Sequence, residues 1–377
     1  MHICFLTSEY PREGQPHGGI GSFVKFLAKK LIDKGINVSV IGINNSYKNE
    51  IVEENGINIY RLKKSKWKFA KFYQQNNSIT KKLKEIHAEN KIDIVEGSEL
   101  NFAFFSKKTP YKKVIRLHGG HHFFAIELGK KTALWRGLQE KKSFKNADSY
   151  IAVSNYVGEQ TKKYLNYNFN YTTIYNTINS KVFSNSNSIP QEKSLLFVGT
   201  VCQKKGVKEL IEAINIVVKE IPEISLTIVG RDWLFKNGSS YIEYVKTFIS
   251  ADSKQCIKFI GAVPQNELPN YISNSAICIF PSHMESFGLT LLEAVFMDKI
   301  VLASDIETFN EIKGNLEGVL SIENINAQEI SERIIYVFNN YNKVKSNLAP
   351  GIKDILNRFN EDKIVKQNIN FYNNVRF

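Results

Sequence analysis

The sequence predicts an α/β protein made of two doubly wound domains that face a central cleft. Two patterns and the length support this fold class. Short apolar segments typical of strands alternate with amphipathic segments typical of helices, which favours parallel sheets covered on both faces. The alternation stops at residues 176–194, a polar segment rich in Asn and Ser, and then restarts. A chain of 377 residues is also too long for one compact core of ordinary size.

The first domain is expected over residues 1–180. Its opening segment, HICFLT, predicts a buried strand and not a signal peptide, because it lacks a basic flank. Apolar residues then recur at helical spacing from Ile20 to Leu31, and Gly35 ends this helix. Further strand segments follow, with helical segments between them: INVSVIGI, DIVEG, KVIRLHG, SYIAVS and TTIYN.

The second domain is expected over residues 181–355. It begins with the strand segment SLLFVGT and an amphipathic helix whose apolar face runs from Val207 to Val218. The strand segments SLTIVG, IKFIG, AICIF and IVLAS follow. Residues 356–377 are expected to form a helix that packs back on the first domain. Because ligands of doubly wound sheets bind beyond the carboxyl ends of strands, functional residues are expected in the loops that follow the strands.

The composition, 43% hydrophobic and 23% charged, is typical of a soluble globular protein. No apolar run approaches the roughly 20 residues that a membrane-spanning helix requires. The four cysteines are scattered, without CxxC or metal-ligand spacing, which favours a reducing cytoplasm.

The net charge of +13 belongs to the first half of the chain. Residues 1–180 hold 29 Lys and Arg against 15 Asp and Glu, whereas residues 181–377 hold 21 against 22. This asymmetry suggests an anionic partner for the first domain, such as a membrane surface or a lipid phosphate. Nucleic acid is disfavoured, because no recognition module accompanies the charge. A solvated basic face without any partner is the alternative.

Three of the loops after strands carry glycine, histidine or lysine. In PREGQPHGGIG, glycines precede a helix and allow a ligand to approach the backbone, although such turns also occur without ligands. In HGGHHFF, His118 directly follows a strand and can donate to a hydroxyl or phosphate, or it is a buried histidine with satisfied hydrogen bonds. In VCQKKGVKEL, Lys204 and Lys205 are placed to neutralise a diphosphate, or they are a solvated pair.

The fourth loop leads into the segment ESFGLTLLE, residues 285–293. If Gly288 begins a helix, its free N–H groups and positive dipole end favour an anion. Glu285 then lies in the loop, and Glu293 lies about 12 Å further along if the whole segment is helical. Two acids this far apart cannot act on one atom, but they can hold the two ends of an extended ligand such as a nucleotide sugar.

The segment ESFGLTLLEA resembles the Glu-x7-Glu motif of family 4 glycosyltransferases, retaining enzymes of the GT-B fold. The resemblance covers nearly the whole chain, because several other segments occur in the family's order. It implies two Rossmann-like domains, the first binding the acceptor and the second binding the nucleotide sugar. The segments are GGIGSFVKFLAKKLIDKGINVSVI, RLHG, IAVSNYV, FVGTVCQKKGVKELIEAI, LTIVG and IKFIGAVPQNELPNYISNSAICIFPS.

The resemblance also implies roles for individual residues. Lys205 would bind the donor diphosphate, Glu285 would contact the donor sugar, and His118 would lie near the reacting carbon. Glu293 would hold the ribose hydroxyls, and the base would lie near 230–231 and 261–263. The donor-binding residues so implied are Gly18, Gly19, Thr200, Lys204, Arg231, Val263, Phe287, Gly288, Leu289 and Glu293.

Thr200 departs from the family pattern. The family commonly has an arginine at this position, paired with the lysine of the same loop. Loss of one cation would weaken stabilisation of the departing diphosphate by a few kcal/mol unless another group compensates. Arg231 or Lys204 is the expected substitute.

The resemblance implies retention of the anomeric configuration. No acid is obviously placed as a nucleophile, which favours front-face substitution in which the departing phosphate helps to deprotonate the acceptor. No Asp-x-Asp occurs in the chain, so no metal or other cofactor is expected, and positive charge with a helix dipole would replace the metal. A UDP-sugar is the expected donor.

The acceptor is expected to meet the first domain. Residues 61–73, RLKKSKWKFAKFY, interleave cations with aromatic residues, a pattern suited to an anionic bilayer or to an ordinary exposed helix or loop. A glycan or lipid-linked acceptor for a surface polysaccharide or glycolipid would place the enzyme in the cytoplasm, at the inner face of the membrane. Two alternatives remain: a nucleotide-sugar epimerase of similar architecture, and a donor-binding protein with little turnover.

Overall fold

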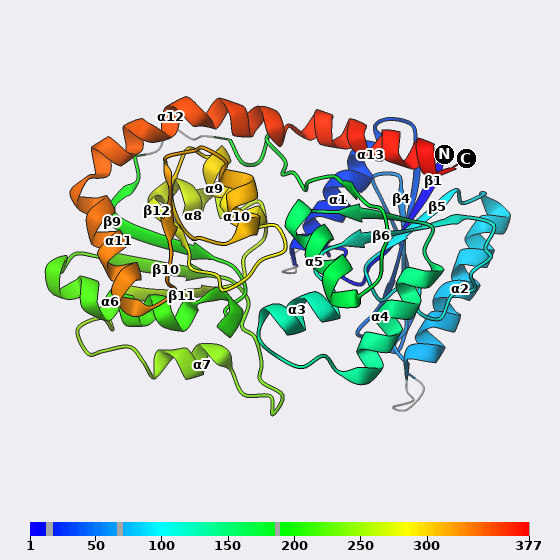
Figure 1. Cartoon of the computed structure of the whole chain (residues 1–377), viewed down its shortest axis with the longest axis horizontal. Coiled ribbons are helices and arrows are strands. Elements are labelled where there is room, and N and C mark those ends of the chain that lie inside the picture. Colours follow the sequence, from blue (N-terminus) through cyan, green and yellow to red (C-terminus); the bar gives the residue numbers. More distant parts are fainter. Residues whose placement is uncertain (13–17, 66–70, 185–188, 377) are drawn as a thin grey trace. The chain divides into compact units, whose positions relative to one another are not determined.

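The computed structural model describes residues 1–12, 18–65, 71–184 and 189–376 (Figure 1). The chain divides into two compact units. Unit 1 holds the described residues up to Asn176 together with the last segment from Glu361, and unit 2 holds the described residues from Thr177 to Asn360. The boundaries expected from the sequence were 180 and 355. No helix among the described residues combines the length and the apolar character needed to cross a membrane.

Unit 1 contains an eight-stranded sheet in the order β3-β4-β2-β1-β5-β6-β7-β8. The strands pair in parallel except for β3 and β4, which are antiparallel. The expected parallel fold is therefore confirmed for this unit. The strands are β1 (His2–Leu6), β2 (Asn37–Ile43), β3 (Glu50–Glu54), β4 (Ile57–Leu62), β5 (Ile94–Gly97), β6 (Lys112–Leu117), β7 (Ser149–Ala152) and β8 (Thr172–Thr173).

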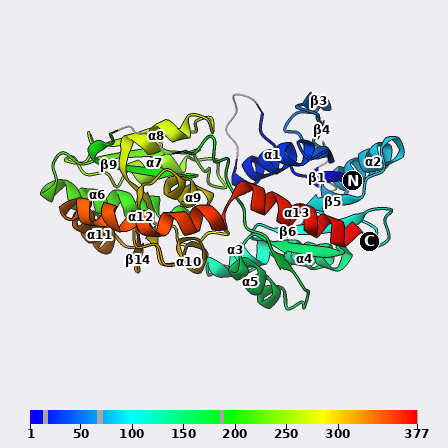
Figure 2. The same ribbon diagram turned by 90° about the horizontal axis from the view of Figure 1, so that it is seen from above.

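The helices of unit 1 flank this sheet (Figure 1). On one face, α1 and α13 lie side by side in both views (Figures 1 and 2) and share an apolar core with the central strands. Lys30 of α1 pairs with Glu361 of α13 at 2.7 Å. The helices are α1 (Gly19–Ile32), α2 (Lys71–Glu89), α3 (His121–Glu127), α4 (Leu134–Asn146), α5 (Asn155–Leu165) and α13 (Glu361–Arg376).

A buried polar network also attaches α13 to the sheet. The guanidinium of Arg116 on β6 donates to both carboxylate oxygens of Glu96 on β5, at 2.7 and 3.1 Å. From α13, the hydroxyl of Tyr372 donates to Glu96 at 2.8 Å, and the side-chain oxygen of Asn368 accepts from Arg116. A buried charge is tolerated only when it is paired and hydrogen-bonded, so this network makes the last helix an integral part of unit 1.

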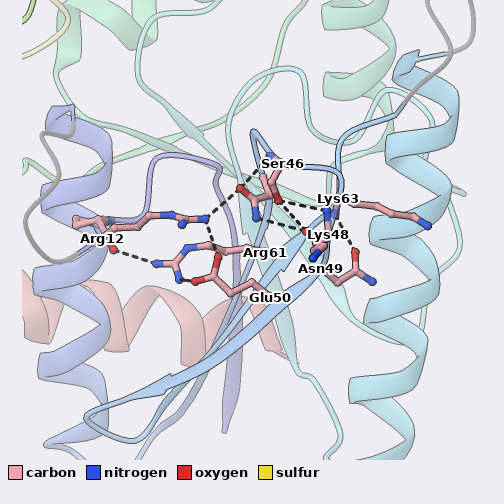
Figure 3. Close-up of polar contacts among 9 residues, drawn as sticks. Arg12, Ser46, Lys48, Asn49, Glu50, Arg61 and Lys63 are labelled. Atoms are coloured by element: carbon pink, nitrogen blue, oxygen red, sulfur yellow. Dashed lines mark hydrogen bonds and ion pairs between the residues drawn. The ribbon is translucent and has the colours of Figure 1, made fainter.

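The β3–β4 hairpin is fixed to the segment that follows β1 by one carboxylate (Figure 3). Glu50 accepts hydrogen bonds from Arg12 at 2.7 Å and from Arg61 at 3.0 Å, and Arg61 also donates to the carbonyl of Pro11. The guanidinium of Arg61 is therefore paired with a carboxylate of the same unit. Of the basic and aromatic stretch expected at residues 61–73, the first two residues belong to β4, and residues 66–70 lie outside the described residues.

Unit 2 contains a six-stranded, fully parallel sheet in the order β11-β10-β9-β12-β13-β14. Its core is built on α6, whose apolar face packs on the strands together with α11. The strands are β9 (Gln191–Val198), β10 (Ser225–Val229), β11 (Ile257–Gly261), β12 (Ser275–Phe280), β13 (Ile300–Ser304) and β14 (Val319–Ile322). The helices are α6 (Val207–Glu220), α7 (Tyr241–Lys246), α8 (Leu268–Asn274), α9 (Leu289–Phe296), α10 (Glu307–Lys313), α11 (Ala327–Asn339) and α12 (Tyr341–Arg358).

Candidate active site

Most of the predicted donor-binding residues lie at the carboxyl edge of the unit 2 sheet. β9 lies between β10 and β12, so the strand order reverses here, and ligands of doubly wound sheets bind at such a point. Gly199 and Gly230 directly follow β9 and β10, and Gly261 ends β11. A Cβ at Gly230 would lie 1.7 Å from the carbonyl oxygen of Gly199. Glycine is therefore required for the close approach of these loop backbones.

The loops after β9 and β12 meet through an ion pair. Lys205 ends the short 3-10 helix η1 (Gln203–Lys205), and its ammonium pairs with the carboxylate of Glu285. The two side chains are only 16% and 11% exposed, and Ser282 donates to the same carboxylate at 3.3 Å. The backbone N–H of His283 donates to the carbonyl of Lys204 at 2.9 Å. The structure thus brings together the predicted catalytic lysine and glutamate, which are 80 positions apart in the sequence.

Three cations lie at this site: Lys205, which belongs to the ion pair, and its neighbours Lys204 and Arg231. Burial lowers the pKa of Lys204, and the neighbouring charges of Lys205 and Arg231 lower it further. Arg231, the second residue after β10, donates through Nε to the hydroxyl of Thr200 at 3.3 Å. The guanidinium of Arg231 therefore lies beside residue 200, the position where the family pattern has an arginine. Arg231 reaches this position from the loop after the neighbouring strand, β10.

The helix after β12 begins as the sequence predicts. Gly288 is the N-cap of α9 with φ of 105°, in the left-handed region that favours glycine, and a Cβ there would lie 2.6 Å from the ring of Phe309. Leu289 is the first helical residue, and Phe287 before it is buried against Phe359, with ring centroids 5.9 Å apart. The free N–H groups at the start of α9 therefore lie at the end of the loop that carries Glu285.

Glu293 lies on the second turn of α9, and its side chain is buried. Burial raises the pKa of its carboxyl to about 8, and a hydrogen bond with Gln265 opposes this shift. Its Oε2 has no hydrogen-bond partner within the described residues. A buried acceptor without a partner is uncommon and is typical of a position that a ligand completes. This observation fits the ribose-binding role implied by the family resemblance.

Unit 1 carries the remaining predicted residues, at the carboxyl edge of its own sheet. Gly18 is the N-cap of α1 and Gly19 is its first residue, while His118 directly follows β6. A Cβ at Gly18 would lie 2.5 Å from a carboxylate oxygen of Glu9. His118 lines a cavity of about 230 Å³ together with the ends of β1 and β5. Burial and the charge of Arg116 lower the pKa of His118 to about 3, so its imidazole is neutral at pH 7.

Two buried carboxylates shape the His118 loop and were missed in the sequence analysis. Glu99 accepts a hydrogen bond from the backbone N–H of His118 at 2.6 Å, and Glu140 accepts one from the N–H of His122 at 2.9 Å while also contacting its ring. A Cβ at Gly120 would lie 1.8 Å from Glu140. Glu99 follows the segment DIVEG and was recognisable as a residue after a strand. Glu140 lies mid-helix on α4, and nothing in its sequence context indicates its role.

Glu99 makes the stability of unit 1 depend on pH. Burial, and then the charge of Glu140, raise the pKa of Glu99 to about 8, so folding stabilises its protonated form. This contribution is complete below the ordinary pKa of about 4.3 and is lost as pH rises through 8, at about 1.4 kcal/mol per pKa unit. We expect Glu99→Gln to flatten the pH dependence of thermal unfolding of the full chain between these limits. The exposed substitution Glu159→Gln is the control, and equal pH profiles for Glu99→Gln and wild type would contradict this account.

Val263 is the predicted donor-binding residue with the least structural support. It lies two residues beyond β11 and is half-buried. The described residues contain no group of three or more His, Cys, Asp or Glu side chains arranged to hold a metal ion. A cavity of about 640 Å³ in unit 2 is lined by residues near the amino ends of β9 and β13, such as Gln191 and Lys299. It is therefore remote from the edge that carries Lys205 and Glu285.

Comparisons with known proteins agree with this fold. The model of Glycosyltransferase Family 4 matches residues 17–182, and that of Glycosyl transferases group 1 matches residues 179–351. The chain is 24% identical over 284 residues (75% of this chain and 67% of the relative) to N,N'-diacetylbacillosaminyl-diphospho-undecaprenol alpha-1,3-N-acetylgalactosaminyltransferase of Campylobacter jejuni.

Two solved structures share the fold over nearly the whole length. Sucrose-phosphate synthase of Thermosynechococcus elongatus has a TM-score of 0.84 at 19% identity, covering 99% of this chain and 98% of that one. The Anabaena protein HepE, in complex with UDP and glucose, has a TM-score of 0.76 at 16% identity, covering 98% of both chains.

The fold and the site together define a glycosyltransferase of the GT-B fold. Because the two family models follow one another along residues 17–351, the chain belongs to the family 4 glycosyltransferases. This membership decides against the nucleotide-sugar epimerase considered as an alternative.

Proposed function

We propose that the protein transfers a sugar from a nucleotide-diphosphate donor to a hydroxyl of a glycan or lipid-linked acceptor, with retention of configuration and without a metal or other cofactor. The observation that carries the proposal is the meeting of Lys205 and Glu285 at the point where the unit 2 strand order reverses. Arg231 lies at the same edge, and α9 begins at the same loop as Glu285. This arrangement combines two cations and a helix N-terminus for a diphosphate with a carboxylate for sugar hydroxyls.

In the proposed reaction, the bond between the anomeric carbon and the diphosphate oxygen breaks, and the acceptor oxygen bonds to the same face of that carbon. The acceptor proton passes to the departing phosphate oxygen. Lys205 and Arg231 stabilise the negative charge that develops on this phosphate, which is the role a metal plays in other transferases. Glu293 accepts hydrogen bonds from the ribose through Oε2, the oxygen left without a partner among the residues that the structure describes.

The donor and acceptor classes are inferred from similar proteins. A UDP-sugar is proposed because HepE, which shares the fold, was solved with UDP and glucose. A lipid-linked acceptor is proposed because the similar Campylobacter jejuni enzyme is named for a diphospho-undecaprenol-linked sugar. With such an acceptor, the protein works in surface polysaccharide or glycolipid synthesis, on the cytoplasmic side of the membrane. Unit 1, with its positive charge and the neutral His118, binds the acceptor.

The test is a panel of UDP-, ADP- and GDP-sugars incubated with the full chain, a lipid-linked acceptor and a metal chelator. We expect release of one nucleoside diphosphate with one donor, and NMR of the product should show the anomeric configuration of that donor. Inverted configuration, or activity only after a divalent metal is restored, would refute the retaining, metal-independent mechanism. Donor binding without release under all conditions would instead support a donor-binding protein with little turnover.

A further inference from the structure

We propose that the exposed face of α4 docks unit 1 on an anionic lipid surface, through Leu134, Trp135 and Leu138 and the cations around them. This inference rests on the proposed lipid-linked acceptor and adds the surface that binds the membrane. It differs from the stretch at residues 61–73 that the sequence suggested.

Three large apolar side chains lie exposed on the first two turns of α4. Leu134 is 81% exposed, Trp135 62% and Leu138 53%. The opposite side of the same helix holds it on unit 1, with Gly137, Glu140, Ser143 and Phe144 buried. Scattered apolar residues on a surface are ordinary, but three together on one short helix segment indicate a binding surface. Tryptophan and leucine beside cations are characteristic of helices that lie in a membrane interface.

The sequence segment that carries these side chains has six cations and a single acid. The segment from residue 129 to residue 147 contains one acid, Glu140, which is fully buried and contacts His122. Elsewhere in unit 1, cations such as Lys25, Lys30 and Arg61 pair with acids. Within the described residues, no ion pair involves the six cations of this segment. They are Lys130, Lys131, Arg136, Lys141, Lys142 and Lys145.

The position of this surface suits a lipid-linked acceptor. The chain leaves β6 at the carboxyl edge of the sheet and continues into α3 and then α4 (Figure 1). His118 directly follows β6, and α4 begins at Leu134 and is followed by β7. The backbone N–H of Ala133 donates to His121 at 2.9 Å, which ties the start of α4 to the start of α3. The exposed leucine and tryptophan therefore lie at the same edge of unit 1 as His118. An acceptor held in the lipid surface would present its headgroup at this edge.

An anionic bilayer is favoured over a second copy of the chain because the surface is strongly basic, and two copies facing each other through it would repel. Each cation close to an anionic membrane increases binding by about fivefold at moderate salt. Charge and apolar area then act together, as they do for stable peripheral helices.

The test is sedimentation of the full chain with vesicles of phosphatidylcholine alone, or of phosphatidylcholine with phosphatidylglycerol. We expect wild type to bind the anionic vesicles at least about tenfold more strongly, and Leu134→Ser/Trp135→Ser to weaken this binding by about tenfold or more. Lys130→Glu/Arg136→Glu should weaken it by a similar factor. The matched control is Trp233→Ser/Leu234→Ser, which removes an adjacent exposed tryptophan and leucine from unit 2, at 44% and 56% exposure.

Release of UDP from a UDP-sugar without acceptor should be unchanged in the two α4 variants, which separates loss of docking from loss of the transferase site. Binding of the α4 variants equal to that of wild type would overturn the proposal. So would loss of binding only in Phe72→Ser/Tyr73→Ser on α2, or equal binding of wild type to neutral and anionic vesicles. A wild-type dimer that the α4 variants dissociate would assign this surface to a second copy instead.

Discussion

Lys205→Ala is expected to lower kcat/KM for nucleoside diphosphate release by about 10²- to 10³-fold. The reason is geometric, because Lys205 supplies the cation that pairs with Glu285 at the reversal of strand order, and its side chain is only 16% exposed. A charge in a partly water-excluded site stabilises a departing diphosphate far more than the same charge in water. The measurement is initial-rate kinetics with the preferred UDP-sugar in the presence of a chelator.

The control for this substitution is Lys208→Ala, which removes a lysine that pairs with Glu212 along the surface of α6. Lys208 belongs to the same region of unit 2 but not to the site, so its loss should change kcat/KM by less than about twofold. If Lys205→Ala and Lys208→Ala have the same effect, the lysine of the η1 loop is not the diphosphate ligand.

The second large effect concerns Arg231. Arg231→Ala is expected to lower kcat/KM by about tenfold to 10²-fold, because Arg231 supplies the second cation beside Thr200. Thr200→Arg in the Arg231→Ala background should recover most of the loss, since it restores a guanidinium at the position the family commonly uses. Thr200→Arg alone should change little, because the charge is already supplied.

The double variant Thr200→Arg/Arg231→Ala tests whether Arg231 supplies the second cation. If Thr200→Arg/Arg231→Ala is no more active than Arg231→Ala, then the arginine acts elsewhere, for example on the base of the nucleotide. If Arg231→Ala has wild-type kinetics, Lys204 is the compensating cation, and Lys204→Ala should then show the larger loss.

The sheets were predictable wherever strands are buried and apolar. The parallel strands around β1 and β9 appear in the sequence as continuous apolar segments, as expected for strands covered on both faces. Neither β3 nor β4 was identified. β3, EIVEE, is a short antiparallel edge strand whose residues are half-buried or exposed. The turn Asn55-Gly56, with φ of 52° and 78°, is nonetheless a strong hairpin signal and could have located the β3–β4 pair.

The individual residues of the site could be predicted from the sequence, but the contacts between them could not. Each candidate residue was located by its position after a strand, but the order of strands in a sheet is not written in the sequence. The contact of Arg231 with Thr200 depends on β10 lying next to β9, and the contact of Glu140 with His122 depends on how α4 packs. The burial that raises the pKa of Glu293 to about 8 also depends on tertiary packing and has no local signature.

The most direct test of the central claim is a calorimetric titration of the full chain with UDP in the presence of EDTA, comparing wild type with Lys205→Ala. The claim is that protein cations, Lys205 foremost, bind the donor diphosphate. It predicts measurable UDP binding by wild type without a metal, and a loss of affinity of about tenfold or more in Lys205→Ala. UDP binding that requires a divalent metal, or that is equal in the two proteins, would contradict the claim.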